Sequence, residues 1–126
     1  MSIGTNAAGL KTKMPSLNSK IEKFQPGCIF IQETKLYRKG QITIDDFEVF
    51  EHVRTKSQGG GLLTAVKKSF DPVLIFEGDD EIELLVVQGK IGNINIRFIN
   101  GYGPQEDGGG LRTLGLLLLL MPDSSN

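Results

Sequence analysis

Three polar residues, Asn6, Glu33 and Tyr102, follow short apolar or alternating segments and together could act on a phosphate ester. Glu33 supplies a carboxylate, and Mg²⁺ usually takes only one or two protein carboxylates while water and phosphate oxygens complete its octahedral shell. Asn6 supplies an amide oxygen that can join this shell or orient a water molecule. Tyr102 can donate a hydrogen bond to a phosphate oxygen as charge develops on it. The set indicates phosphodiester chemistry if the three strands are neighbours in one sheet, so that the three residues meet at one edge of it.

Each of these residues also has a purely structural interpretation. Glu33 fits an ordinary solvated carboxylate at a strand end, and Tyr102 can pack over a turn beside Pro104. Asn6 can bond its own backbone in a turn. Spacing alone therefore predicts an α/β or α+β domain and leaves its function open.

The segments around these residues must position them. The pattern of residues 3–6 predicts the end of a first strand, and residues 7–11 are expected to form the loop that follows it. Apolar residues then recur at helical spacing: Met14, Leu17, Ile21 and Phe24. Thr12 is the expected cap of that helix, and Gln25-Pro26-Gly27 its stop. The apolar run Cys28–Ile31 is typical of a strand buried on both faces in a parallel β-α-β unit, at whose carboxyl end functional groups gather.

After Gly40 the pattern changes to short strands and turns. The candidate strands are residues 47–53, 62–66, 73–76, 82–88 and 94–99. The last two predict a hairpin. Asn100–Pro104 predicts a tight loop at its end. Residues 107–126, with Gly108–Gly110 and a five-leucine run, are expected to be a low-complexity tail of doubtful structure.

Composition narrows the classes of function. The chain has 126 residues, 39% of them hydrophobic and 23% charged, which indicates one soluble globular domain. A net charge of -1 argues against nucleic-acid binding by broad electrostatics, though not against a metal that grips one or two phosphates. The single cysteine, Cys28, is expected to be a core residue in a reducing compartment. No signal peptide is evident and the run Leu116–Leu120 is too short to cross a bilayer, so we expect an intracellular protein, nuclear or cytoplasmic, without membrane contact.

Four segments resemble, in their order, the motifs of the endonuclease/exonuclease/phosphatase superfamily. They are Asn6-Ala7-Ala8-Gly9-Leu10, Gln32-Glu33-Thr34-Lys35, Gly59-Gly60-Gly61-Leu62 and Asn100-Gly101-Tyr102-Gly103-Pro104. The residues of these motifs are most similar to those of the endonuclease domain of non-LTR (LINE-type) retrotransposons. The resemblance spans about residues 3–106. The second motif is the most specific of the four.

The resemblance implies a fold, an activity and roles for particular residues. The implied fold class is α+β, the first half of a four-layer α/β sandwich, with a mixed, mostly antiparallel sheet and an outer helix. The implied activity is hydrolysis of a phosphodiester in DNA, or of a related phosphate ester, with Mg²⁺ or Mn²⁺. By resemblance Glu33 and Asn6 bind the metal, and Asn6 and Tyr102 are the catalytic residues. Weaker phosphate or DNA contacts fall to Asn100, Lys35 and Arg54, while the glycine segment has a structural role.

The chain also departs from the family. The Gly-Asp-x-Asn and Ser-Asp-His motifs do not occur in it, and its only histidine, His52, lies in a strand-like segment. We therefore expect residues 1–106 to be a truncated domain with weak or absent metal binding and no hydrolysis alone. The missing half is expected to supply the covering sheet. Without it five apolar residues are expected to face water: Leu84, Val86, Ile94, Ile96 and Phe98. This predicts self-association through an uncovered sheet. A non-catalytic retroelement remnant or binding module, and a phosphatase- or phospholipase-type member of the superfamily, remain alternatives.

Overall fold

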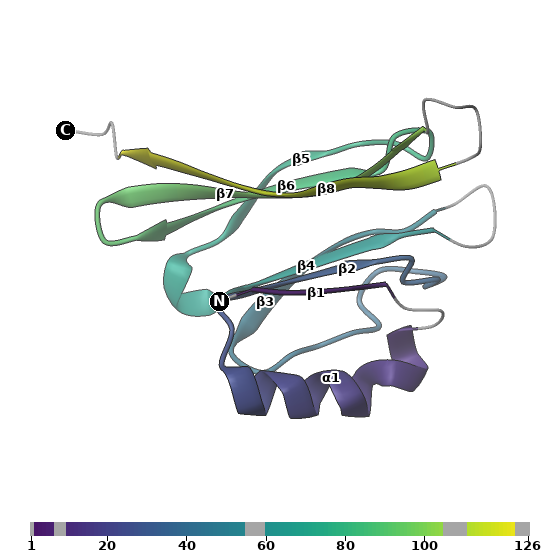
Figure 1. Cartoon of the computed structure of the whole chain (residues 1–126), viewed down its shortest axis with the longest axis horizontal. Coiled ribbons are helices and arrows are strands. Elements are labelled where there is room, and N and C mark those ends of the chain that lie inside the picture. The colour runs from purple at the N-terminus through teal and green to yellow at the C-terminus, as the bar shows by residue number, and fades with distance from the viewer. Residues whose placement is uncertain (1, 7–9, 55–59, 105–110, 123–126) are drawn as a thin grey trace.

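The computed structural model describes residues 2–6, 10–54, 60–104 and 111–122. Over these residues the chain is a mixed α/β structure in which two β-sheets face each other and an α-helix covers one of them. Figure 1 shows three layers, with the helix outermost, the first sheet in the middle and the second sheet beyond it. The expected mixed α/β class with an outer helix is confirmed.

The first sheet grows from a β-α-β unit. Its strand order is β1-β2-β4-β3, with β1 at Ser2–Asn6, β2 at Cys28–Gln32, β4 at Leu62–Lys67 and β3 at Phe47–His52. β1 and β2 are parallel, and the other pairings are antiparallel. Every residue of β2 is buried, as its continuous apolar run predicted.

The helix α1 spans Leu10–Phe24 and starts earlier than the capping pattern predicted. Thr12 therefore lies inside the helix, and its predicted role as the cap is wrong. Leu10 is only 1% exposed, and its backbone N–H donates to the Thr34 carbonyl at 3.2 Å. This tertiary anchor satisfies an amide that a side-chain cap would otherwise have to satisfy.

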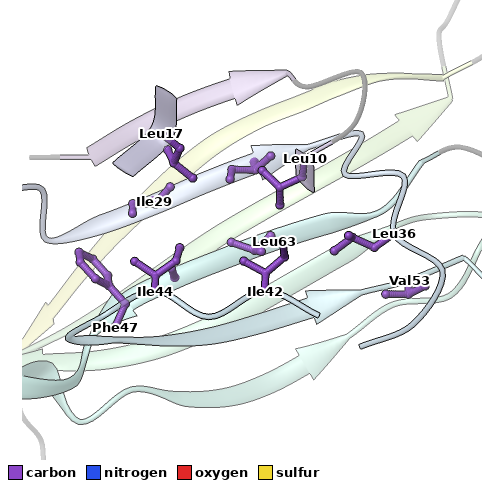
Figure 2. Packing of buried hydrophobic residues seen from close by; sticks show 11 residues of the cluster. Leu10, Leu17, Ile29, Leu36, Ile42, Ile44, Phe47, Val53 and Leu63 are labelled. Carbon is purple, nitrogen blue, oxygen red and sulfur yellow. The ribbon is translucent and has the colours of Figure 1, made fainter. Parts of the chain in front are cut away.

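A first hydrophobic core lies between α1, the segment before β3 and the outer face of the first sheet (Figure 2). Leu10 and Leu17 come from the helix, while Ile29 and Leu63 point at them from neighbouring strands. Ile42 and Ile44, from the segment between β2 and β3, are 5% and 6% exposed and close the same core. The helical spacing and the buried β2 run thus produce one packed layer.

The second sheet is built from the later part of the chain. Its strand order is β5-β6-β7-β8, with β5 at Val73–Glu77, β6 at Leu84–Ile91, β7 at Ile94–Pro104 and β8 at Leu111–Pro122. All its pairings are antiparallel, and the predicted β6–β7 hairpin is confirmed. A short 3₁₀ helix, η1 at Lys68–Phe70, connects the two sheets.

Two expectations for the last part of the chain are wrong. Asn100–Pro104 is not a tight loop but the end of β7, which stays paired with β8 across an irregularity between Gly101 and Tyr102. Residues 107–126 were expected to be a tail of doubtful structure, but the backbone of Leu111–Pro122 forms β8; residues 107–110 and 123–126 lie outside the described part. Backbone pairing with β7 overrides the weak local signal of these glycine-rich and leucine-rich segments.

A second hydrophobic core fills the space between the two sheets. Phe30 of β2 meets Phe98 of β7 with ring centroids 6.3 Å apart, and Ile96 is 5% exposed. The expectation that a missing half supplies the covering sheet is therefore wrong, because β6 and β7 already cover the first sheet. Among the five residues expected to face water, Ile96 and Phe98 are buried, while Leu84 and Val86 are half-buried and Ile94 is 46% exposed.

Exposed apolar residues concentrate instead on β5, an edge strand of the second sheet. Val73, Leu74, Ile75 and Phe76 are 59%, 37%, 44% and 51% exposed. Self-association stays a prediction, and its basis moves from an uncovered sheet face to this edge strand. No helix within the described residues has both the length and the apolar character needed to cross a bilayer.

Cys28 occupies the second core, as its apolar context predicted, and is 4% exposed. Burial raises the pKa of its thiol to about 11 from a usual value of 9.0. Because the thiolate is the reactive form, we expect a disulfide reagent at pH 8 to label the folded protein at least about 100-fold more slowly than the urea-unfolded protein. Equal labelling rates in the two states would contradict this burial.

Candidate functional site

The backbones of Asn6 and Glu33 lie side by side at one end of the first sheet. Asn6 is aligned with Gln32 in the parallel β1–β2 pairing, so it neighbours the residue that immediately precedes Glu33. The carboxyl ends of parallel strands meet at one sheet edge, as the sequence analysis assumed for these two residues.

Tyr102 comes from the second sheet, so the assumption that all three residues lie on neighbouring strands of one sheet is wrong. Hydrogen bonds nevertheless join its strand to the end of β2. The Gln32 Nε2 donates to the Asn100 Oδ1 at 3.2 Å and to the Gly101 carbonyl at 3.3 Å. Gly101 directly precedes Tyr102, so the backbones of Asn6, Glu33 and Tyr102 all reach the same end of the sandwich. We call this end, with Gln32–Lys35, Gly60–Gly61 and Asn100–Gly101, the polar end.

Asn100 is the centre of this connection. It is 0% exposed, and its Nδ2 donates to the Leu63 carbonyl at 3.0 Å, the Ile31 carbonyl at 3.3 Å and the Thr64 Oγ1 at 3.4 Å. A buried amide with this many partners holds the two sheets in one relative position. Asn100 therefore shapes the polar end from within, and its burial keeps it from direct contact with a ligand in this conformation.

The two predicted site residues on the segment after β2 face solvent. Glu33 and Lys35 are exposed, and both adopt left-handed backbone conformations, with φ of 58° and 55°. No described residue makes a hydrogen bond or ion pair with the Glu33 side chain, so its carboxylate is open to a ligand. The side chains of Asn6 and Tyr102 lie outside the described part of the structure.

The glycine run holds this exposed segment in place. The Gly61 carbonyl accepts the Glu33 N–H at 2.9 Å, and the Gly60 carbonyl accepts the Lys35 N–H at 2.9 Å. Gly60 and Gly61 have φ of 67° and 93°, which favours glycine over residues with a side chain. A Cβ at Gly61 would lie 2.4 Å from the Thr34 Oγ1, so close approach also requires glycine there. Gly59 lies outside the described residues.

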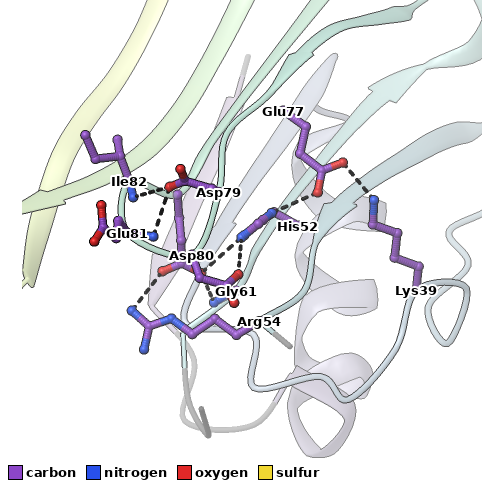
Figure 3. Close-up of polar contacts among 10 residues, drawn as sticks. Lys39, His52, Arg54, Gly61, Glu77, Asp79, Asp80, Glu81 and Ile82 are labelled. Carbon is purple, nitrogen blue, oxygen red and sulfur yellow. Dashed lines mark hydrogen bonds and ion pairs between the residues drawn. The ribbon is translucent and has the colours of Figure 1, made fainter. Parts of the chain in front are cut away.

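A charged cluster lies beside the polar end, where β3 of the first sheet meets β5 and β6 of the second (Figure 3). We call it the His52 cluster; its members are Lys39, His52, Arg54, Glu77, Asp80 and Glu83. The imidazole is 6% exposed, with Nδ1 2.8 Å from the Glu77 Oε2 and Nε2 3.2 Å from the Asp80 Oδ1. These contacts connect the two sheets by charge-assisted hydrogen bonds in a largely dry setting.

Arg54, a predicted phosphate contact, belongs to this cluster. Its NH2 group lies 3.4 Å from the Glu83 Oε2, and the two side chains are 16% and 0% exposed. The guanidinium compensates a fully buried carboxylate, which would be costly without a partner. The structure thus engages Arg54 inside the protein, whereas Lys35 faces outward.

Charge pairing within the cluster sets a pH dependence. Burial alone would raise the pKa of Glu77, but hydrogen bonds from Lys39, at 2.7 Å, and from His52 outweigh it and hold that pKa below its usual range. A carboxyl whose folded pKa lies below its unfolded value stabilises the fold above the unfolded value. This contribution is lost as pH falls through the folded pKa.

We therefore expect the urea midpoint of the protein to fall as pH drops below about 4.5, and to fall less in Glu77→Gln. Urea unfolding followed by circular dichroism from pH 7 to pH 3 measures this. Glu48→Gln, at an exposed position of β3, controls for the change in net charge. Parallel pH profiles for wild type and Glu77→Gln would contradict a stabilising role for the Glu77 pairing.

The described residues offer Mg²⁺ a modest but chemically suitable ligand set. Within residues 2–122, apart from the undescribed segments, no group of three or more His, Cys, Asp or Glu side chains is arranged to hold a metal ion. Mg²⁺ does not require such a group, since it often takes one or two carboxylates and keeps several waters. The open Glu33 carboxylate, beside the backbone of Asn6, fits this mode.

No protein-family model and no solved structure matches the chain.

The His52 cluster was missed by sequence reasoning. Its members come from separate segments, and no periodic pattern links them. The signal present in the sequence was the acidic stretch Glu77–Glu83, in which five of the seven residues carry a carboxyl group. Both ring nitrogens of His52 contact carboxylates, and this arrangement becomes visible only when the fold places β3 and β5 together.

Proposed function

We propose that this chain supplies the metal- and phosphate-binding part of a Mg²⁺-dependent phosphodiesterase domain of the endonuclease/exonuclease/phosphatase class. Its motifs are most similar to those of LINE-type endonuclease domains, so DNA is the proposed substrate. The observation that supports this best is the Gln32–Asn100–Gly101 hydrogen bonding. It brings the backbone at Tyr102 to the end of the sandwich where the backbones of Asn6 and Glu33 already meet.

In this proposal each residue of the polar end has a distinct role. Glu33 and the Asn6 amide hold Mg²⁺ or Mn²⁺, which polarises a phosphoryl oxygen when bound. Tyr102 donates a hydrogen bond to a non-bridging phosphate oxygen. Lys35 is the outward-facing cation for a neighbouring phosphate. Asn100 and Arg54 support the site from within the protein.

The chain alone is proposed to be inactive. Its sequence contains no Gly-Asp-x-Asn or Ser-Asp-His motif, so the groups that activate water and support the leaving group in the family have no counterpart. Catalytic residues that act as a unit lose most of their effect when some are absent. We expect plasmid nicking with Mg²⁺ to stay at the level of buffer. Nicking that Glu33→Gln abolishes would contradict inactivity while supporting the metal role of Glu33.

Metal binding gives a test that does not need turnover. A bound Mn²⁺ ion broadens the NMR signals of nearby amides, so low Mn²⁺ concentrations are expected to broaden residues 32–35 and the backbone near Asn6 first. Glu33→Gln should remove this broadening. Glu22→Gln, the same substitution at an exposed position of α1, should not. Equal broadening in wild type and Glu33→Gln would overturn the proposed site.

A further inference from the structure

Glu83 is a buried carboxylate that the proposed site does not use directly. Its side chain is 0% exposed, and its Oε1 accepts the backbone N–H of Gly61 at 2.6 Å. Oε2 lies 3.4 Å from the Arg54 NH2, and Oε1 lies 4.0 Å from the His52 Nε2. Burying a carboxylate is costly even when it is paired, so its position behind the glycine run calls for a structural or functional reason.

The hydrogen bonds of the glycine run connect Glu83 to the segment that carries Glu33. The N–H of Gly61 and the carbonyl of Gly60 belong to one peptide group. Glu83 accepts from its N–H, and Lys35 donates to its carbonyl at 2.9 Å. The next carbonyl, of Gly61, accepts the Glu33 N–H at 2.9 Å. A single carboxylate therefore fixes the peptide group to which Lys35 is bonded, and this peptide group is adjacent to the one whose carbonyl accepts the Glu33 N–H.

Two physical effects make this connection matter. A charged acceptor on one side of a peptide group polarises it, which strengthens the hydrogen bond accepted on the other side. In addition, Glu33 and Lys35 have positive φ, a conformation that is unfavourable for residues with a Cβ and that the surroundings must enforce. The glycines themselves are free to adopt other conformations, so they cannot enforce it alone.

We propose that Glu83 is a positioning residue for Glu33, acting through the Gly60–Gly61 peptide group. Arg54 lies 3.4 Å from the Glu83 carboxylate and so helps to hold it behind the glycine run. This inference rests on the proposed function, because it assigns Glu33 the metal-binding role. It adds a residue outside the four resembling motifs to the machinery of the site.

Two substitutions at Glu83 separate the hydrogen bond from the charge. Glu83→Leu removes the acceptor for the Gly61 N–H, whereas Glu83→Gln keeps an acceptor oxygen of the same reach. Loss of a group that orients a metal ligand typically weakens metal binding by about 10- to 100-fold. We therefore expect Glu83→Leu to weaken Mn²⁺ binding at Glu33 by at least about tenfold, and Glu83→Gln to restore most of it. Glu77→Gln, in the same cluster but without a bond to Gly61, should bind Mn²⁺ like wild type.

The experiment combines Mn²⁺ titration, read from amide broadening, with hydrogen exchange at the amides of Glu33, Lys35 and Gly61. All variants are compared under conditions where their amide spectra are dispersed. Faster exchange at these three amides in Glu83→Leu, but not in Glu77→Gln, is the expected signature. If Glu83→Leu does not fold, hydrogen exchange in wild type and Glu83→Gln tests the inference instead. Gly61 and Lys35 amides that are unprotected in wild type would overturn it.

The outcomes also separate this inference from the proposed function. Absence of Mn²⁺ binding at Glu33 in wild type would remove the proposed function, and with it the role of Glu83 toward a metal. Wild-type binding that Glu33→Gln abolishes, together with unchanged binding in Glu83→Leu, would overturn only the role of Glu83.

Discussion

Replacing Asn100 with Asp is expected to lower the free energy of unfolding by about 3–5 kcal/mol. The Asn100 amide nitrogen faces the carbonyl oxygens of Leu63 and Ile31, at 3.0 and 3.3 Å. Asp has almost the same shape, but it places an acceptor, and at neutral pH a charge, against those oxygens. The side chain is 0% exposed, so bulk solvent does not compensate this change.

Asn95→Asp is the matched control for this prediction. Asn95 lies on the same strand, β7, and is half-buried on its outward side. The same chemical change there is expected to alter stability by less than about 1 kcal/mol. Urea unfolding followed by circular dichroism measures both variants. Similar losses for the two substitutions would mean that the sheets do not depend on the Asn100 hydrogen bonds.

Gly61→Ala is expected to cost about 2–4 kcal/mol and to disturb the segment that carries Glu33. Two effects add at this position. The backbone has φ of 93°, and a Cβ would lie 2.4 Å from the Thr34 Oγ1 and 3.3 Å from the His52 carbonyl. Neither the Thr34 side chain, which is buried, nor the backbone of β3 can move away freely.

Gly40→Ala separates these two effects. Gly40 has φ of 84°, but a Cβ there would meet no atom within 4 Å. Its substitution therefore carries the backbone cost alone, about 1–2 kcal/mol. The difference between the two variants in free energy of unfolding gives the cost of steric overlap at Gly61. No difference would show that the contact with Thr34 relaxes without penalty.

The local sequence pattern was sufficient to predict the elements whose apolar residues recur at a regular spacing or form a continuous run. The helix over Leu10–Phe24, the buried strand β2 and the β6–β7 hairpin were all predicted from spacing and apolar runs. The helix was predicted to start after Thr12, whereas it starts at Leu10, whose backbone N–H donates to the distant Thr34 carbonyl. The extension of β7 through Gly103 and Pro104 was missed because those residues signal a turn unless a partner strand is present.

The sequence likewise predicted one part of the candidate site and missed another. The position of Glu33 after a buried parallel strand, next to Asn6, followed from the β-α-β pattern. The position of Tyr102 in the facing sheet did not, since no local signal states which sheet a strand will join. The hydrogen bonds that reach this strand arise from Gln32 and Asn100, 68 residues apart in the chain. Glu83 was overlooked for the same reason, because its importance lies in one backbone amide of a distant glycine.

Each sheet is built from its own continuous stretch of chain, with residues 2–67 forming one and residues 73–122 the other. Only the short η1 connection passes between them. Every strand pairing therefore closes within one stretch, and association of the two finished layers is a separate event with a small entropic cost of loop closure. This arrangement favours a folding route in which two preformed layers dock, with the buried amide of Asn100 selecting their final alignment.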